Sequence, residues 1–282
     1  MRHVATSLLL LGATVLGCGA SDEHDGARTV PFPDDLTAYV DQSRLQREGR
    51  TLFVRLVNDA ERRVTVTHAD IESPRFGTIT WTGEKSFENE ADLEFELPKS
   101  GCGTGSDAEV QLTYRIDDGP ELRSTTTATD RYGAVALFMD RDCAEERLGE
   151  AATLELGAAR ILGEGKDSVY ELPVTLTPTG AQDDVAFMGF EDTVLFRQVP
   201  GSAHVDEGIT YPLGPDDPPV EVVLRLIPSR CDPHALADDK VGTLVPVRVT
   251  GPDLPASAAF YLPIGDERRA ALRGFVPTHC EW

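Results

Sequence analysis

Four of the five cysteines constrain the fold most, because they occur as two pairs in two similar halves of the chain. Cys102 and Cys143 lie in the first half, and Cys231 and Cys280 lie in the second. The seven residues that end at Cys102 read ELPKSGC, and those that end at Cys231 read RLIPSRC. Both strings join an apolar strand end to Pro, Ser and Cys, which indicates that a structural unit is present twice.

A weaker echo precedes the second cysteine of each pair. The segment 133–139 ends four residues before Cys143, and the segment 270–276 ends four residues before Cys280. The chain has no strict short-period repeat, which argues against a solenoid. The sequence therefore predicts two diverged copies of one domain.

Alternating apolar and polar residues predict half-buried β-strands in both copies. Leu93, Phe95 and Leu97 alternate with acidic residues, and the segment 109–116 has the same period. The remaining candidate strands are 51–57, 63–71, 77–82, 122–127 and 134–139 in the first copy, and 169–177, 185–190, 193–199, 220–227, 243–250, 258–262 and 270–276 in the second. No long amphipathic helix is expected, and 233–239 is predicted to form one or two helical turns.

The strand pattern predicts an all-β chain of two tandem antiparallel sandwiches, over residues 36–148 and 149–282. About seven short strands per copy, separated by turns such as Asn58-Asp59 and Asp117-Asp118-Gly119-Pro120, are typical of such sandwiches. The pattern is similar to that of immunoglobulin-like domains in strand number and length. The resemblance is architectural, because neither cysteine pair brackets a Trp.

The formal charge of −22 excludes some classes of partner. Nucleic-acid binding needs clustered Lys and Arg to neutralise phosphates, so no nucleic-acid partner is expected. Electrostatic docking on anionic lipid is disfavoured for the same reason.

The first 17 residues have the pattern of a secretory signal peptide. A basic start, Met1-Arg2-His3, precedes a mostly apolar run from Val4 to Leu16. This run is shorter than the roughly 20 residues that a membrane-spanning helix needs. The pattern therefore predicts export rather than a membrane span.

The leader ends in Val15-Leu16-Gly17-Cys18, which resembles the lipobox of bacterial lipoproteins. That resemblance implies cleavage before Cys18, acylation of its thiol, and a membrane partner held through the lipid. An ordinary signal peptide that leaves Cys18 as a free thiol is the alternative. Arg exceeds Lys and Asn is scarce, as in high-G+C genomes, so an actinobacterial source is expected.

Residues 18–35 would then form the lipidated Cys and a disordered acidic stalk, rich in Gly, Ser, Asp and Pro. The flexible part, residues 19–35, would have an r.m.s. reach of roughly 20 to 25 Å. The expected location is the extracytoplasmic face of the cell membrane.

Export to an oxidising compartment favours one disulfide within each copy, Cys102 with Cys143 and Cys231 with Cys280. Four cysteines allow three pairings. A structural zinc site is the rival explanation, and it is disfavoured because no two cysteines have the close spacing of zinc ligands.

Motifs that would indicate catalysis or a cofactor are absent. The sequence contains no G-x-S-x-G, H-E-x-x-H, P-loop or dinucleotide-binding pattern. His68 lies in a predicted strand, where it is either a buried base or a strand-end residue that reaches solvent. His204, His234 and His279 are expected in loops, where they could approach one another, although nothing in their spacing requires it.

Acidic pairs could supply oxygen ligands for Ca²⁺, but such pairs are more often simply solvated. These pairs are Asp140 with Asp142, Asp216-Asp217 and Asp238-Asp239. Met139 and Met188 are expected in the cores, and Trp81 and Trp282 could anchor an interface. No metal, cofactor or catalytic residue is predicted.

The leading interpretation is a lipid-anchored, non-catalytic binding or scaffolding module with an envelope or extracellular protein partner. Sandwich folds present loops and sheet faces to partners, which supports this interpretation. Two alternatives stay open. One is an envelope enzyme or enzyme-accessory subunit with an acidic and histidine site between the domains, and the other is a passive spacer.

Overall fold

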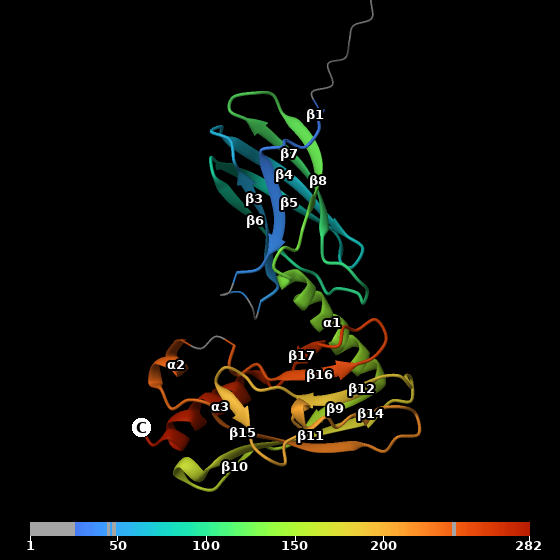
Figure 1. Ribbon diagram of the computed structural model, residues 1–282, viewed down its shortest axis with the longest axis vertical. Helices are drawn as coiled ribbons and strands as arrows, with labels where there is room; N and C mark the ends of the chain where they lie inside the picture. Colours follow the sequence, from blue (N-terminus) through green and yellow to red (C-terminus); the bar gives the residue numbers. More distant parts are fainter. Residues whose placement is uncertain (1–25, 44–45, 47–48, 239–240) are drawn as a thin grey trace, which may run out of the picture.

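The chain forms two β-rich bodies arranged end to end along the long axis of the molecule (Figure 1). A computed structural model describes residues 26–282 except 44–45, 47–48 and 239–240. The expected leader, Cys18 and most of the expected stalk lie outside these residues. Among the described residues, no helix combines the length and the apolar character that a membrane crossing requires.

The first body consists of two sheets that enclose an apolar core. The five-stranded sheet has the order β1-β8-β7-β4-β5, and the three-stranded sheet has the order β2-β3-β6. The strands of the first sheet are β1 (Arg28–Thr29), β8 (Leu122–Ala128), β7 (Ala108–Ile116), β4 (Val64–Ser73) and β5 (Gly77–Phe87). Those of the second are β2 (Leu36–Asp41), β3 (Thr51–Asn58) and β6 (Glu90–Glu96). All pairs are antiparallel except β1 with β8.

The second body also has two antiparallel sheets. One has the order β10-β11-β15-β13, with β9 also paired to β11, and the other has the order β14-β12-β16-β17. The first contains β9 (Ala152–Leu156), β10 (Arg160–Leu162), β11 (Val169–Pro178), β13 (Phe196–Gln198) and β15 (Val220–Pro228). The second contains β12 (Ala186–Phe190), β14 (Tyr211–Pro212), β16 (Pro246–Thr250) and β17 (Ala259–Tyr261).

The two bodies share one strand topology. In the first body β3 lies between β2 and β6, and in the second β11 lies between β9 and β15. The other sheets also correspond, because β4 pairs with β5 and β7, and β12 pairs with β14 and β16. Each body then ends in a helix that carries the second cysteine of its pair. The repeated sequence strings therefore mark repeated structure.

Two expected strands are helical, which corrects the sequence-based prediction of no long helix. Residues 134–139 begin α1 (Ala134–Ala151), and residues 270–276 lie within α3 (Gly265–Cys280). The buried residues of α3 are Leu272, Phe275, Val276, His279 and Cys280, at the spacing of one helix face. Helical periodicity therefore outweighed the local strand-like composition. The short helix α2 (Pro233–Asp238) confirms the turns expected there.

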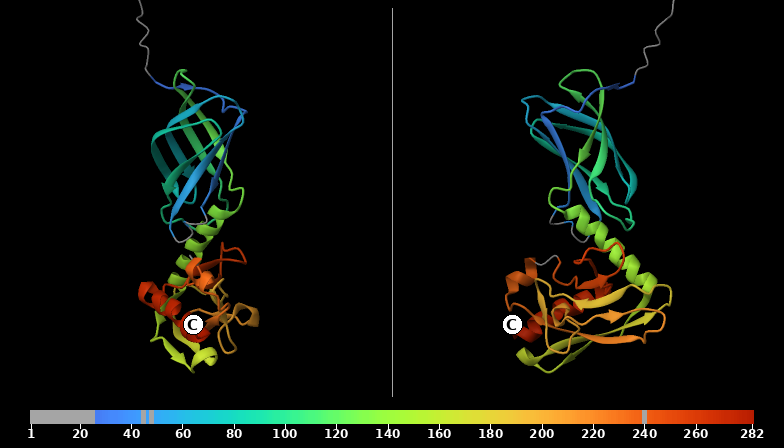
Figure 2. Two further views of the ribbon diagram at one scale, coloured as in Figure 1. Left: turned by 90° about the vertical axis from the view of Figure 1, so that its left-hand side faces the viewer. Right: turned by 45° about the vertical axis from the view of Figure 1, so that its right-hand side comes forward.

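Helix α1 is shared between the two apolar cores. Val135, Phe138 and Met139 pack into the core of the first body, and Ala144 and Leu148 pack into that of the second. The expected domain boundary after residue 148 thus falls inside this helix. Figure 2 shows α1 running from one body to the other, so the junction is a packed helix rather than a loose linker.

Both expected disulfides are present. Cys102 pairs with Cys143 across 4.8 Å between their Cα atoms, and Cys231 pairs with Cys280 across 5.3 Å. Each bridge joins a loop to the helix that closes its body. Structural disulfides persist in oxidising compartments, so these two indicate an extracytoplasmic location.

Candidate functional site

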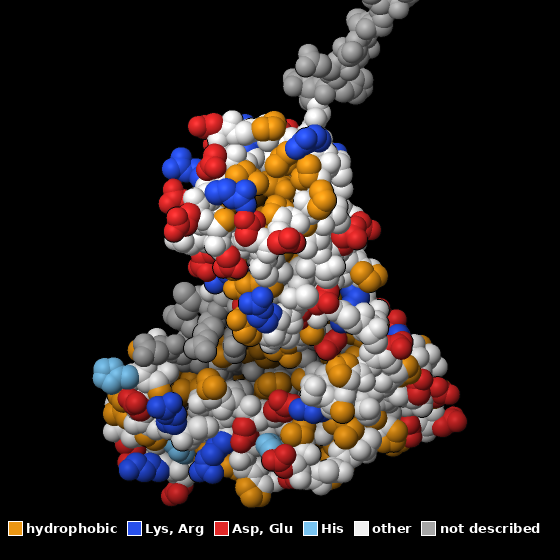
Figure 3. Space-filling model, turned by 45° about the horizontal axis from the view of Figure 1, so that its top comes forward, with side chains coloured by type: hydrophobic (Ala, Val, Ile, Leu, Met, Phe, Trp, Pro, Cys, Tyr) orange, Lys and Arg blue, Asp and Glu red, His pale blue; other side chains and the backbone are white. Residues whose placement is uncertain are grey.

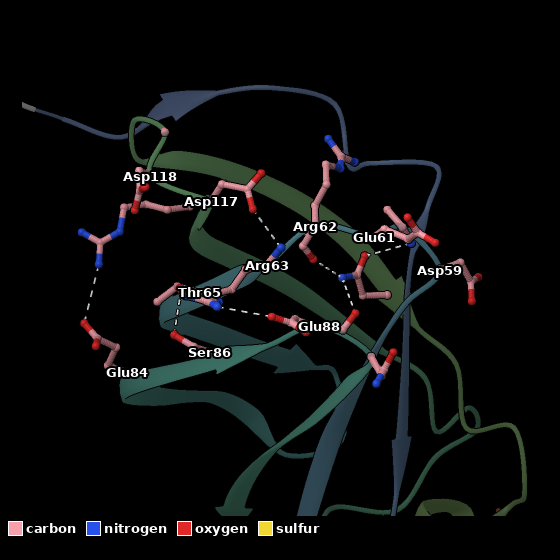
Figure 4. A pocket seen from close by; sticks show the side chains of 15 residues that line it. Asp59, Glu61, Arg62, Arg63, Thr65, Glu84, Ser86, Glu88, Asp117 and Asp118 are labelled. Carbon is pink, nitrogen blue, oxygen red and sulfur yellow. Dashed lines mark hydrogen bonds and ion pairs between the residues drawn. The ribbon is translucent and has the colours of Figure 1, made fainter.

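A large hollow lies at the end of the first body where residues 26–35 enter (Figure 4). Its volume is about 880 Å³. Three turns form most of it, one between β3 and β4, one between β5 and β6, and one between β7 and β8. Its lining residues are Asn58, Asp59, Ala60, Glu61, Arg62, Arg63, Thr65, Glu84, Ser86, Glu88, Asn89, Arg115, Asp117, Asp118 and Gly119.

Asn58 ties two of these turns together. Its Nδ2 donates hydrogen bonds to the carbonyl oxygens of Arg62, at 2.7 Å, and Glu88, at 2.8 Å. The third turn is fixed by Asp117, whose carboxylate accepts a hydrogen bond from the amide of Arg63 at 3.0 Å. Asn58 is 7% exposed, so its contacts are largely protected from water. The hollow is therefore preformed by side-chain to backbone hydrogen bonds.

The walls of the hollow carry both signs of charge, with an excess of carboxylates. Arg63 lies 3.3 Å from Glu88, and Arg115 lies 3.6 Å from Glu84. Arg62 binds Asp35 of the entering segment.

Three other carboxylates in the hollow, those of Asp59, Glu61 and Asp118, have no hydrogen bond or ion pair within the described residues. The local field therefore favours a cationic group.

The chemistry of the lining fits recognition of a polar group. Ser86 and Thr65 are hydrogen-bonded to each other at 2.8 Å, and the described lining contains neither His nor Cys. Small-molecule sites are mostly apolar with a few placed polar groups, whereas these walls are dominated by charge. The hollow suits the charged side chains of another protein better than an apolar ligand.

The four histidines named in the sequence analysis have different structural surroundings. His68 is on β4 next to a β-bulge, where the register with β5 and β7 shifts between Val66 and His68. The bulge turns the side chain of His68 away from the core. Its Nε2 then lies 3.2 Å from Oδ2 of Asp70. A hydrogen bond from Thr80 chiefly holds the pKa of Asp70 below its ordinary value.

His279 is in α3 and buried, which corrects the expectation of a loop. Its Nδ1 donates to the carbonyl of Ser168 at 2.9 Å, so it fastens the helix to the segment before β11. His234 lies in α2, within the helical turns expected there, and His204 caps the short helix η3 (Val205–Glu207). The described structure does not bring these histidines together.

Two carboxylates of the acidic pairs bind arginine side chains within the fold. Asp142 accepts hydrogen bonds from Arg50 Nη1 at 2.7 Å and Nη2 at 2.6 Å, and from the amide of Ser100 at 2.8 Å. Burial alone would raise the pKa of Asp142, but these hydrogen bonds hold it below its ordinary value. Asp140 binds Arg75 at 3.0 Å. Within the described residues no three His, Cys, Asp or Glu side chains come together as a metal site.

A smaller hollow of about 420 Å³ lies between the two bodies. Its described lining includes Asp140 and Asp253 and contains no histidine. Arg75 of the first body, whose side chain is 4% exposed, forms an ion pair with Asp140 of α1. Arg147, also on α1, lies 3.5 Å from Asp253. These carboxylates therefore serve the junction.

The methionine and tryptophan side chains named in the sequence analysis differ in burial. Met139 is buried in the first core, as expected, whereas Met188 is half-buried and is not among the described residues of the second core. Trp81 packs partly against the first core, and Trp282 is 48% exposed. The arginines of the large hollow were not singled out. The turns at Asn58 and Asp117 were recognised, but only strand pairing shows that they meet.

Comparisons with known proteins give no family. No family model and no curated protein matches the chain. Weak structural matches include the exo-chitosanase CsxA of Amycolatopsis orientalis, at 15% identity over 77% of this chain with a TM-score of 0.20. A β-glycosidase from Bacteroides vulgatus matches at 12% identity over 79% of this chain, with a TM-score of 0.18.

The BSP domain of a biofilm-associated protein matches at 11% identity over 90% of this chain, with a TM-score of 0.21. The chain spans 25% and 24% of the two glycosidases and 61% of the BSP-domain chain. At these scores the matches carry no argument about function.

Proposed function

We propose that this protein is a lipid-anchored extracytoplasmic binding module, built from two immunoglobulin-like sandwiches and without catalytic activity of its own. The lipobox-like string before Cys18 supports the anchor, and the two disulfides support export. The junction through α1, which packs into both cores, supports a role in which the two bodies act together.

The preformed acidic hollow is the observation that carries the proposal. Its turns are fixed by Asn58 and Asp117 before any partner binds, which lowers the cost of ordering on association. Asp59, Glu61 and Asp118 line it without partners in the described structure. The favoured partner is a protein of the cell envelope that presents Lys or Arg side chains. The hollow is on the side where the anchored segment enters, so the partner would lie near the membrane.

Crosslinking in intact cells, followed by recovery of the anchored protein, tests this function. The expected result is a defined crosslinked partner for the wild type and its loss in the double variant Glu61→Lys/Asp118→Lys. The matched control is Glu155→Lys/Glu207→Lys, which makes the same charge change at exposed positions of the second body. Absence of any crosslinked partner for the wild type would contradict binding and favour a passive spacer.

The anchor is tested separately. Cys18→Ser is expected to move the protein from the membrane fraction to the soluble fraction. Persistence of the variant in the membrane fraction would contradict the lipid assignment.

A further inference from the structure

The strand β6 forms an open edge of the first body. The three-stranded sheet has the order β2-β3-β6, so β6 has a paired strand on one side only. In the second body the corresponding strand, β15, is paired on both sides, because β13 also pairs with it. Phe196, Arg197 and Gln198 of β13 lie opposite Pro228, Ile227 and Leu226 of β15. The second body thus fills with its own chain a position that the first body leaves unfilled.

The register shows which backbone groups β6 presents at this edge. The amide of Leu97 donates to the carbonyl of Arg50 at 2.8 Å, and the amide of Asn58 donates to that of Asn89 at 2.7 Å. In an antiparallel pair, residues alternate between facing the partner strand and facing away. The N–H and C=O groups of residues 90, 92, 94 and 96 therefore point away from β3, and they have no backbone partner in the described structure.

The same four residues form a row of carboxylates. They are Glu90, Asp92, Glu94 and Glu96, spaced two residues apart between the buried Ala91, Leu93 and Phe95. Acidic side chains gather on the side of the first body where β3 and β6 lie (Figures 1 and 3).

Counter-charge along this row is sparse. Arg55 binds Asp92 at 2.6 Å and lies 3.9 Å from Glu90. Glu94 has no hydrogen bond or ion pair within the described residues. Lys85 lines the same hollow as three of these carboxylates. Counted over the described residues, the row still carries more negative than positive charge.

A hollow of about 420 Å³ runs beside this edge, between β5 and β6. Its lining residues are Trp81, Lys85, Glu90, Ala91, Asp92 and Glu94. Trp81 comes from β5 and provides an apolar wall. Trp81 and the acidic residues 90, 92 and 94 line this one hollow, so a strand added to β6 would meet both.

We propose that β6 binds an extended segment of a partner protein by strand addition, and that this segment carries Lys or Arg at every second position. Directly opposed residues on one face of a sheet have neighbouring side chains, so each basic residue would face one carboxylate. The backbone groups of the edge supply affinity, and the carboxylate row supplies specificity. A second copy of β6 would oppose acid to acid, which disfavours self-pairing there. The inference rests on the proposed binding function but uses a different surface from the hollow at the turns.

The test uses the purified protein and a labelled nine-residue peptide that alternates Lys with Thr or Val. A peptide of the same composition with its Lys residues contiguous is the control. Fluorescence anisotropy is expected to show tighter binding of the alternating peptide. Hydrogen exchange of the wild-type protein is expected to show that this peptide protects the amides of residues 92, 94 and 96.

Two variants at one position separate charge from backbone. Glu94→Gln keeps the N–H and removes the charge, and we expect about threefold weaker binding. Glu94→Pro also removes the outward N–H, which proline can lack at a sheet edge, and we expect at least about tenfold weaker binding. Glu207→Gln, in the second body, is the matched control and should leave binding unchanged.

Equal binding of both peptides, or unprotected amides in the wild-type complex, would overturn the inference. The exchange measurement needs no variant, so it decides the question even if Glu94→Pro fails to fold. These outcomes are independent of the crosslinking experiment. A crosslinked partner lost with Glu61→Lys/Asp118→Lys alone would support the binding function and leave the β6 inference to the peptide data.

Discussion

The C-terminal helix of each body is attached at the same position of the fold, but by different chemical groups. In each, the residue before the helix cysteine is polar and buried, Asp142 in α1 and His279 in α3. Each binds the residue that immediately precedes the middle strand of the neighbouring sheet, Arg50 before β3 and Ser168 before β11. The same position thus holds an ion pair in the first body and a hydrogen bond from an imidazole to a backbone carbonyl in the second.

The two bodies therefore attach their closing helices at the same position of the fold. The groups that make the attachment differ between them. The first body must also anchor a helix that it shares with its neighbour. Arg50 and Arg75 bind Asp142 and Asp140 on α1, which adds two ion pairs near the junction. Helix α3 has only one core to bind, and its anchor is correspondingly simpler.

Removing a disulfide gives the largest expected effect. The bridges close segments of similar length, with separations of 41 and 49 residues, so the chain-entropy model predicts a similar loss for both, roughly 2 to 5 kcal/mol in unfolding free energy. The paired variants are Cys102→Ala/Cys143→Ala and Cys231→Ala/Cys280→Ala, measured by denaturant unfolding.

The local consequences should differ between these variants. Helix α1 keeps its ion pairs and both cores, whereas α3 keeps only one core and His279. Limited proteolysis is therefore expected to cut within α3 of the second variant before it cuts within α1 of the first. Earlier cleavage of α1 would contradict the comparison.

Asp142→Ala is expected to cost about 3 kcal/mol in unfolding free energy, because removing one partner of a buried pair leaves the other unpaired. The side chain of Asp142 is 5% exposed and that of Arg50 is 31% exposed, so Arg50 can recover some hydration. Denaturant unfolding measures the loss. Glu88→Ala, which breaks the exposed pair with Arg63, is the control and should cause no measurable change. A cost as small as that of the control would show that the ion pair contributes little.

The same residue gives the first body a dependence on acid. The folded-state pKa of Asp142 is lowered, so its contribution is complete above the unfolded pKa of about 3.9 and is lost as the pH falls through the folded pKa. The protection of the α1 amides, that is their exchange rate relative to that of an unstructured chain at the same pH, is therefore expected to fall below about pH 4 in the wild type. In Asp142→Asn that loss of protection should be absent. Glu171 on β11 also has a lowered pKa, chiefly through a hydrogen bond from Arg160, so a probe local to α1 is needed.

The helices show what the sequence could and could not predict. Over 134–139 alone, the apolar run fits a strand. Val135, Phe138, Met139 and Cys143 have the spacing of a helix face, but this period becomes visible only over a longer window. Pro277 inside α3 weakened the same signal in the second body.

Strands and disulfides were more predictable because they depend on local alternation and on cysteine parity. The disulfides and most long strands occur as expected, whereas β1, β2, β9, β10 and β14 were not foreseen. The turns of the hollow were foreseen singly. Their convergence depends on strand order, which brings Arg63, Glu88 and Asp117 together from separate parts of the chain. The open edge at β6 depends likewise on the absence of a neighbouring strand.

His279→Ala is the smallest of the expected effects, about 1 to 2 kcal/mol in unfolding free energy. The variant loses the hydrogen bond from Nδ1 to the carbonyl of Ser168 and the packing of the imidazole against Phe275, whose ring centre lies 5.5 Å away. Ser168→Ala is the matched control. It keeps that carbonyl and removes the hydroxyl, which donates to the carbonyl of Gly165 at 2.5 Å and lies 3.3 Å from the same nitrogen. Denaturant unfolding should rank the control as the milder change, because the imidazole and its hydrogen bond to the carbonyl of Ser168 are kept. A Ser168→Ala cost equal to that of His279→Ala would contradict this ranking.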